Sequence, residues 1–233
     1  MNIGLIGFGV VGKAAANTFQ KRYNIVKYDK FLELDVFDDL LECEFVFIVV
    51  PTPFDCEQNI VDESAVLESL ENLEKLGYNG KVVVKSTIPP GACERYIEKF
   101  DLEIIFNPEF LRESTTPNED FENQDTVVIG TESLDSFNSV KEMYQSVLIE
   151  DAEYYHTTPT EAEMIKCAQN TMLASRVALA NMIYDACKEN NVDYDKVREI
   201  SFDSFPILGP YMVQVPGPDG NRGFGGKCLP KDI

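Results

Sequence analysis

One cysteine in this sequence, Cys228, lies in surroundings that would make its thiol reactive. It belongs to the run GFGGKCLPKD over residues 223–232, with Lys227 directly before it and Lys231 three residues after it. Because nearby ammonium groups stabilise a thiolate, we expect these lysines to lower the pKa of the Cys228 thiol. A thiolate in a glycine-rich loop is suited to attack a carbonyl carbon and form a covalent intermediate. The other five cysteines lack such surroundings and are predicted to be packing residues.

Lys166 and Asn170 stand four residues apart in a stretch that is predicted to be one long helix. The run TPTE at 158–161 provides a helix start, with a threonine cap, a proline at the first helical position and a glutamate three residues after the cap. No glycine or proline follows until after Asn190, so the helix would run roughly 45 Å at about 1.5 Å per residue. Residues four apart share one helix face, so Lys166 and Asn170 are expected to lie side by side.

The run GFGVVG at 7–12 has the spacing of a phosphate-binding turn between a strand and a helix. The first glycine permits a tight turn, the second lets the backbone approach a pyrophosphate, and the third lets the helix pack close to the strand. Asp29 ends the next predicted strand, where its carboxylate would bind an adenosine ribose and repel a 2′-phosphate. With Lys30 beside it, this site is predicted to bind NAD. The predicted contacts in the turn are Gly7, Gly9, Val10, Val11 and Gly12.

Short apolar runs alternate with amphipathic helical patterns through roughly the first 150 residues. Several runs consist of valine, isoleucine and phenylalanine without polar alternation, as in strands that are covered on both faces. This alternation predicts an α/β fold, a Rossmann-type doubly wound parallel sheet followed by the long central helix. The predicted strands span residues 3–7, 25–28, 45–50, 81–86, 103–106 and 126–129. The predicted helices outside the central one span 13–19, 63–76, 133–147 and 194–200.

Three short motifs directly follow predicted strands. The run VPTP at 50–53 follows the third strand, STIPPG at 86–91 follows the fourth, and NPEFLRE at 107–113 follows the fifth. The carboxyl ends of parallel strands lie at one edge of an open α/β sheet, and ligands bind there. We therefore expect all three motifs to lie at the same edge as the glycine-rich turn.

Together with EMIKCAQN at 163–170 and GFGGKCLPKD at 223–232, these motifs resemble, in type and order, those of the UDP-glucose/GDP-mannose dehydrogenase family. The resemblance covers nearly the whole chain and is closest to the branch that acts on UDP-glucose. It implies an NAD-dependent oxidation of C6 of a nucleotide sugar from alcohol through aldehyde to carboxylate, as from UDP-glucose to UDP-glucuronate. The aldehyde would pass through a cysteine thiohemiacetal and a thioester.

The resemblance also implies catalytic roles. Cys228 would be the nucleophile, while Lys166 and Asn170 would stabilise the charge that develops on the C6 oxygen. Asp232 would assist proton removal in the first oxidation. Glu109 would activate water for thioester hydrolysis, and Thr87 would hold a water nearby.

Binding roles follow in the same way. The further cofactor contacts that the resemblance implies are Pro51, Thr52, Ser86, Thr87 and Glu113. The implied substrate contacts are Phe110, Leu111, Arg112, Lys166, Asn170, Phe224 and Gly225. His156, the single histidine, lies outside every motif and is predicted to be structural.

The net charge of −20, from 40 acidic and 20 basic residues, would repel nucleic acid and anionic membranes, so neither is an expected partner. The N-terminus lacks a signal peptide pattern, and no apolar run approaches the roughly 20 residues that span a bilayer. The cysteines show no zinc-like spacing, so no metal is expected, and they are predicted to be reduced thiols of a cytoplasmic protein.

Two parts are expected along the chain. Residues 1–157 would form the NAD-binding Rossmann domain, and residues 158–233 would hold the long helix and the cysteine loop, where the region for substrate binding and dimerisation begins. We expect a homodimer through this helix. Family members normally continue into a second nucleotide-sugar domain, which is expected to be absent from this chain.

Two alternatives remain open at this point. A single-step dehydrogenase of the 3-hydroxyacid or 6-phosphogluconate type also pairs a Rossmann domain with a helix that carries Lys-x-x-x-Asn, but it needs no cysteine. A non-catalytic NAD-binding fragment would fit a chain that lacks the second domain.

Overall fold

The structure is a computed structural model that describes residues 1–112, 116–205, 207–209, 213–217 and 220–223. The chain divides into two compact units, Met1–Lys166 and Cys167–Ile233, and we describe each by itself.

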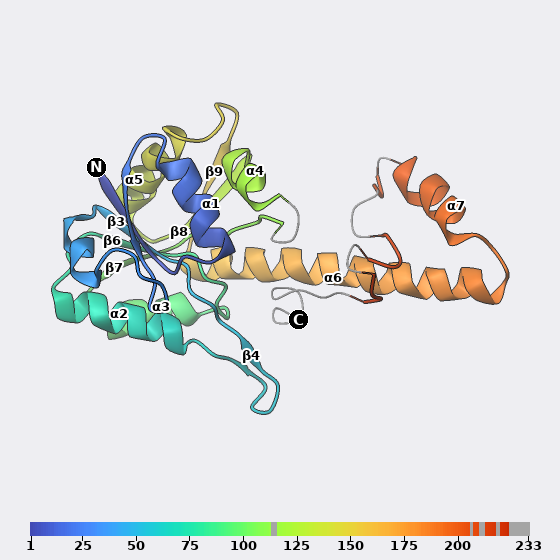
Figure 1. Cartoon of the computed structure of the whole chain (residues 1–233), viewed down its shortest axis with the longest axis horizontal. Coiled ribbons are helices and arrows are strands. Elements are labelled where there is room, and N and C mark those ends of the chain that lie inside the picture. The colour runs from blue at the N-terminus through green and yellow to red at the C-terminus, as the bar shows by residue number, and fades with distance from the viewer. Residues whose placement is uncertain (113–115, 206, 210–212, 218–219, 224–233) are drawn as a thin grey trace. The chain divides into compact units, whose positions relative to one another are not determined.

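A mixed sheet of seven strands forms the centre of the first unit (Figure 1). The strand order is β2-β1-β3-β6-β7-β8-β9, and the first five strands in this order are parallel. The six predicted strands are all present, with ends that shift by one or two residues. The strands are β1 (Asn2–Ile6), β2 (Asn24–Tyr28), β3 (Phe45–Ile48), β6 (Lys81–Val84), β7 (Glu103–Phe106), β8 (Thr126–Gly130) and β9 (Glu153–Thr157).

The sheet departs from the predicted all-parallel arrangement at β8, which pairs with β7 in the antiparallel sense through Phe106 and Gly130. The described part of the connection between these strands includes the short helix α4 (Pro117–Glu122). The last strand, β9, pairs parallel to β8 and was not predicted, because its sequence EYYHT is polar and lies at the sheet edge.

Helices cover both faces of this sheet, which confirms the doubly wound Rossmann-type class. On one face pack α1 (Val10–Phe19), α4 and α5 (Leu134–Gln145), through a core that includes Phe19, Phe121 and Tyr144. On the other face pack the 3-10 helix η1 (Phe37–Glu42), α2 (Ser64–Leu76) and α3 (Ala92–Lys99).

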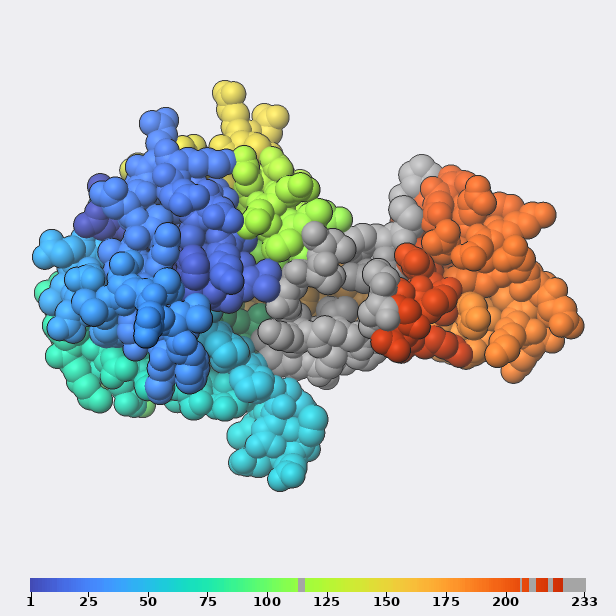
Figure 2. All heavy atoms as spheres, viewed as in Figure 1, coloured from blue at the N-terminus to red at the C-terminus, as the bar shows by residue number. Residues whose placement is uncertain are grey.

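A small antiparallel hairpin, β4 (Phe54–Asp55) with β5 (Ile60–Val61), stands out from the rest of the first unit (Figure 2). Two strands of two residues each give too short a pattern for sequence periodicity to detect.

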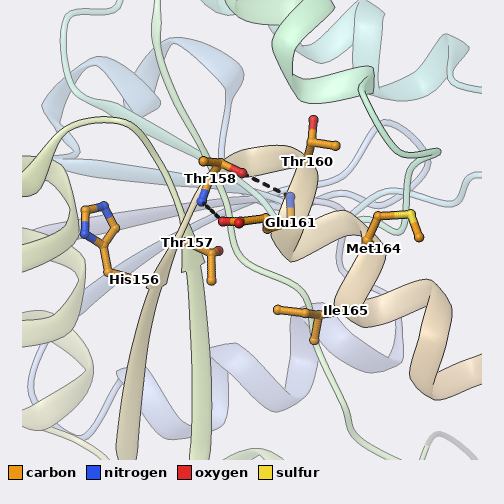
Figure 3. Close-up of a pocket in the computed structure, with 7 residues that line it drawn as sticks. All are labelled: His156, Thr157, Thr158, Thr160, Glu161, Met164 and Ile165. Carbon is orange, nitrogen blue, oxygen red and sulfur yellow. Dashed lines mark hydrogen bonds between the residues drawn. The ribbon is translucent and has the colours of Figure 1, made fainter.

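The long central helix, α6 (Pro159–Glu189), begins and ends close to the predicted positions. Its start is a capping box: the Thr158 amide donates to Glu161 Oε2 at 2.8 Å, and the Glu161 amide donates to Thr158 Oγ1 at 3.2 Å (Figure 3). Because this pair satisfies two amide groups at the helix start, the first residue of α6 is set by local sequence.

The second unit continues from α6 into α7 (Tyr194–Arg198) and a π-helical turn, η2 (Glu199–Asp203). A small core of Ala180, Cys187, Tyr194, Val213 and Val215 holds the described part of this unit together. Among the described residues of both units, no helix is long and apolar enough to cross a membrane.

Candidate active site

The glycine-rich turn joins β1 to α1, and its three glycines meet different surroundings. Gly7 has a φ of +98°, and a Cβ placed there would lie 2.3 Å from the backbone oxygen of Val49. A Cβ at Gly12 would lie 2.2 Å from the backbone oxygen of Gly7. A Cβ at Gly9 would meet no atom of the described residues within 4 Å. Gly7 and Gly12 are therefore required by the fold itself, whereas the space in front of Gly9 is open to a ligand.

The acid that follows β2 is held close to this turn. Asp29 Oδ2 accepts from the Phe8 amide at 2.8 Å, and Oδ1 accepts from the Phe31 amide at 2.9 Å. The adjacent Lys30 pairs with Glu68 on α2, with Nζ 2.6 Å from Oε1, and this partner raises the pKa of Lys30. The carboxylate thus lies beside the glycine-rich turn, while the lysine ammonium pairs with an acidic side chain. A contact between Asp29 and a ribose stays a prediction.

The loops after β3 and β6 are joined by hydroxyl groups at the same edge of the sheet. Ser86 Oγ donates to the Val50 carbonyl oxygen at 2.7 Å and accepts from the Val50 amide at 2.9 Å. Thr52 Oγ1 donates to the Thr87 carbonyl oxygen at 2.6 Å. Two of the predicted cofactor residues, Thr52 and Ser86, are thus buried links between the loops, while the neighbouring Pro51 is exposed.

A buried ion pair lies at the end of β7. Lys166 Nζ, on α6, donates to the Glu109 backbone oxygen at 2.6 Å and to its Oε1 at 3.2 Å. The other carboxylate oxygen of Glu109 accepts from the Leu111 amide at 2.9 Å. The exposed fractions are 7% for Glu109 and 4% for Lys166. The Lys166 ammonium also lies 5.4 Å from the centre of the Phe110 ring, so two of the predicted functional motifs meet here.

The first turns of α6 are anchored to α3, and this anchoring places Lys166. The carboxylate of Glu163, which has no exposed surface, accepts from the Gly91 amide at 2.5 Å and from the Cys93 amide at 2.7 Å. Burial raises the pKa of this carboxyl group, while the two amide donors oppose that effect. Because Lys166 follows three residues later, the cap at the start of α3 fixes the register at which α6 reaches Glu109.

A second buried lysine was missed by sequence reasoning. Lys85 directly follows β6, is 1% exposed, and its Nζ donates to Asn107 Oδ1 at 2.9 Å, to the Pro108 carbonyl oxygen at 3.3 Å and to the Tyr144 hydroxyl at 3.3 Å. Burial lowers the pKa of Lys85 to about 7, against the opposing effect of the negative charge on Glu109. The signal in the sequence is the lysine that ends the apolar run VVVK at the carboxyl end of a strand.

Arg112 faces α4. Its guanidinium forms a two-pronged pair with Asp120, at 2.6 Å and 2.9 Å, and holds the pKa of that carboxyl group down to about 2. This pair orders the chain just before residue 113. A contact between Arg112 and a sugar nucleotide stays a prediction.

Several predicted residues lie elsewhere. Asn170 belongs to the second unit, follows Lys166 by four residues in α6 and is buried. Five predicted site residues lie outside the described residues: Glu113, Phe224, Gly225, Cys228 and Asp232.

The single histidine makes the contacts of a structural residue. His156 Nε2 lies 2.9 Å from the Thr131 carbonyl oxygen, and the ring stacks on Phe137 with centroids 4.6 Å apart. A shallow pocket lined by His156, Thr160 and Met164 opens beside it (Figure 3). It lies where β9 ends, and the pairing of Phe106 with Gly130 and of Gly130 with Thr157 places this point level with the carboxyl end of β7.

Five parallel strands with a glycine-rich turn after β1 and an acid after β2 define a Rossmann-type dinucleotide-binding domain. Residues 27–148 match the model of the NAD-binding domain of the UDP-glucose/GDP-mannose dehydrogenase family, and residues 160–233 match the model of its central domain. The chain belongs to this family, and it contains the family's NAD-binding domain.

Individual relatives support this placement. The UDP-glucose 6-dehydrogenase of Rickettsia felis is 31% identical over 204 residues, which cover 84% of this chain and 43% of the relative. A UDP-glucose dehydrogenase from Pyrobaculum islandicum superposes with a TM-score of 0.84 at 26% identity, over 99% of this chain and 62% of that one. A UDP-D-ManNAc dehydrogenase from Pyrococcus horikoshii, at 23% identity and a TM-score of 0.83, shares the fold over 100% of this chain and 63% of that one. The chain spans about half the length of the curated relatives that it matches.

Two glycine substitutions should separate cofactor binding from folding. Gly9→Ala is expected to leave the fold intact, because its Cβ has free space, and to weaken NAD binding by at least about tenfold by blocking the close approach of the pyrophosphate. Gly12→Ala is expected to destabilise the fold, because its Cβ would meet the Gly7 backbone oxygen. Titration calorimetry with NAD and thermal unfolding measure the two effects. A Gly9→Ala variant that binds NAD like the original chain would refute this assignment.

Proposed function

We propose that this chain carries the NAD-binding and catalytic part of a nucleotide-sugar 6-dehydrogenase, which oxidises a C6 alcohol to a carboxylate in two steps. The observation that carries the proposal is the buried Glu109–Lys166 pair at the carboxyl end of β7. It lies at the sheet edge that also holds the glycine turn, three strands away, or about 14 Å at roughly 4.8 Å per strand. An extended dinucleotide bound at the turn reaches that far along the edge.

The open space in front of Gly9, the crowding at Gly7 and Gly12 and the position of Asp29 fit a bound NAD. Two NAD molecules, bound one after the other, would supply the hydride acceptors for the two oxidations. The chain would hold each of them through the predicted contacts: Gly7, Gly9, Val10, Val11, Gly12, Asp29, Lys30, Pro51, Thr52, Ser86, Thr87 and Glu113.

In the first oxidation, the C6 hydroxyl would lose its proton with assistance from Asp232, and the hydride would leave the C6 carbon. Lys166 and Asn170 stabilise the negative charge that develops on the oxygen. Burial supports this role for Lys166, because a cation acts more strongly on a developing charge when water is excluded.

The second oxidation needs a nucleophile, because an aldehyde must gain a bond before it can lose a hydride. The Cys228 thiolate adds to the carbonyl carbon, and the resulting thiohemiacetal loses a hydride to become a thioester. Glu109 then takes a proton from water as the water oxygen adds to the thioester carbon, and the cysteine thiolate leaves. Thr87 would hold this water, and Phe110, Leu111, Arg112, Phe224 and Gly225 would line the sugar-nucleotide pocket.

UDP-glucose is the proposed substrate, because the Rickettsia felis relative named above is a UDP-glucose 6-dehydrogenase. The test is an NADH assay with UDP-glucose, UDP-N-acetylmannosamine and GDP-mannose, run with this chain and with a full-length counterpart. Two NADH per carboxylate formed are expected with UDP-glucose. NAD binding without NADH production from any of the three sugars would contradict the proposal and favour a non-catalytic NAD-binding module.

We also propose a homodimer in the cytoplasm. Within the second unit, α6 exposes Met172, Leu179 and Met182 on one side of the helix, as expected for a face that a second copy covers. The described cysteines are all free thiols, in keeping with a reducing compartment. Sedimentation at micromolar concentration is expected to give twice the mass of one chain, and a monomer would refute the dimer.

A further inference from the structure

Lys85 contacts the turn that carries Glu109. The turn, residues 107–109, follows β7, and Lys85 directly follows the neighbouring parallel strand β6. The amino group therefore points at the backbone of the turn from within the sheet layer. It donates to Asn107 Oδ1 at 2.9 Å and to the Pro108 carbonyl oxygen at 3.3 Å.

The same contacts reach a third element. Tyr144 on α5 accepts from Lys85 Nζ at 3.3 Å and donates to Asn107 Oδ1 at 2.7 Å, while Asn107 Nδ2 donates to the Val128 carbonyl oxygen on β8 at 2.7 Å. The turn is thus fixed on one side by Lys85, Tyr144 and β8. On its other side Lys166 holds Glu109 through the backbone oxygen and the carboxylate.

Burying the Lys85 side chain at this position costs free energy of folding, because the amino group loses its contact with water. All the hydrogen-bond partners of Lys85 within the described part of the chain are uncharged, and the side chain is fully buried. The charged groups near it are Glu109 after β7 and Lys166 on α6, and burial outweighs the effect of Glu109 on its pKa. The Phe121 ring on α4 lies 5.3 Å from the ammonium. An apolar side chain of similar length would fill the space at a lower cost in desolvation.

We propose that Lys85 is a positioning residue for hydrolysis of the thioester: it holds the Asn107–Pro108 backbone so that the Glu109 carboxylate stays in place to activate water. This inference rests on the proposed function. Lys85 would act through Glu109 and would not touch the substrate. Its loss should therefore slow the hydrolysis and spare both hydride transfers.

The test compares Lys85→Met with Lys75→Met, a matched change at an exposed lysine on α2. Full-length protein is mixed with NAD and UDP-glucose, and NADH absorbance and intact protein mass are followed together. For Lys85→Met we expect a rapid burst of two NADH per site, then steady turnover slower by about 10- to 100-fold, as for a misplaced catalytic group. The mass of the thioester adduct should accumulate on the variant but not on Lys75→Met or the unsubstituted protein.

A second variant tests the same proposal if Lys85→Met does not fold. Tyr144→Phe keeps the ring that packs against Phe19 and Phe121 but removes the hydroxyl between Lys85 and Asn107. We expect the same accumulation of thioester with a smaller slowing.

Three outcomes are distinct. Equal slowing of the burst and of steady turnover in the folded variants would overturn the positioning role and leave the proposed function standing. Unchanged turnover in both variants would also overturn the positioning role and leave the proposed function standing. If the unsubstituted protein forms no NADH from any nucleotide sugar, the proposed function itself falls, and this inference falls with it.

Discussion

Cys228→Ser is expected to abolish formation of the carboxylate, with a loss on the order of 10³-fold or more in acid production, while hydride transfer from the C6 alcohol continues. The serine hydroxyl is a far weaker nucleophile than a thiolate, and the lysines at 227 and 231 can favour a thiolate but not an alkoxide at neutral pH. Without the covalent adduct, the aldehyde carbon has not gained the bond that it needs before it can release its hydrogen as a second hydride. NADH formation should therefore stop at one equivalent per sugar oxidised, and the aldehyde should be trapped by a carbonyl reagent.

Cys56→Ser is the matched control, because Cys56 is an exposed free thiol on the β4–β5 hairpin and belongs to none of the predicted motifs. It should keep two NADH per carboxylate. A Cys228→Ser variant with an undiminished rate and an acid product would show that the cysteine is not the nucleophile. An undiminished rate with a single NADH per sugar in both forms would instead indicate a single-step dehydrogenase.

Lys166→Met is expected to lower the free energy of unfolding by about 3–5 kcal/mol, because it leaves the buried Glu109 carboxylate without its cation. In a unit of this size the melting temperature should fall on the order of 10 °C. Turnover should fall by a further 10²- to 10³-fold, roughly the effect of removing one group that stabilises an oxyanion. Thermal unfolding and steady-state kinetics with UDP-glucose measure the two losses separately.

The double variant Lys166→Met with Glu109→Gln separates the ion pair from packing. Once both charges are gone, no uncompensated buried charge remains, so much of the lost stability should return while activity stays low. If the double variant is as unstable as the sum of the single ones, the pair does not couple in the folded chain. Such a result would remove the central observation behind the proposed function.

Local sequence was sufficient for the parts of the molecule that depend on neighbours along the chain. The glycine turn at 7–12 could be placed because its spacing encodes a strand–turn–helix geometry, and the lack of space for a Cβ at Gly7 and Gly12 agrees with that logic. The start of α6 could be placed because a capping box is a contact between residues three apart. The common edge of the loops after β1, β3, β6 and β7 followed from the rule for parallel strands, and the pairing of those strands confirms it.

Contacts between distant residues were decided only by the tertiary structure. Lys166 and Glu109 are 57 residues apart in sequence, and Lys85 and Tyr144 are 59 apart. No periodicity relates such positions, because their meeting depends on how α5 and α6 pack against the sheet. The antiparallel direction of β8 and the polar edge strand β9 escaped prediction for the same reason. Each depends on pairing with a neighbouring strand, and the segment's own sequence does not show that pairing. The sequence by itself thus determined which motifs follow the parallel strands and at which edge of the sheet those motifs lie. The packing of helices on the sheet determined that the turn at residues 107–109 contacts Lys85 on one side and Lys166 on the other, because only tertiary contacts can pair charges that the chain keeps far apart.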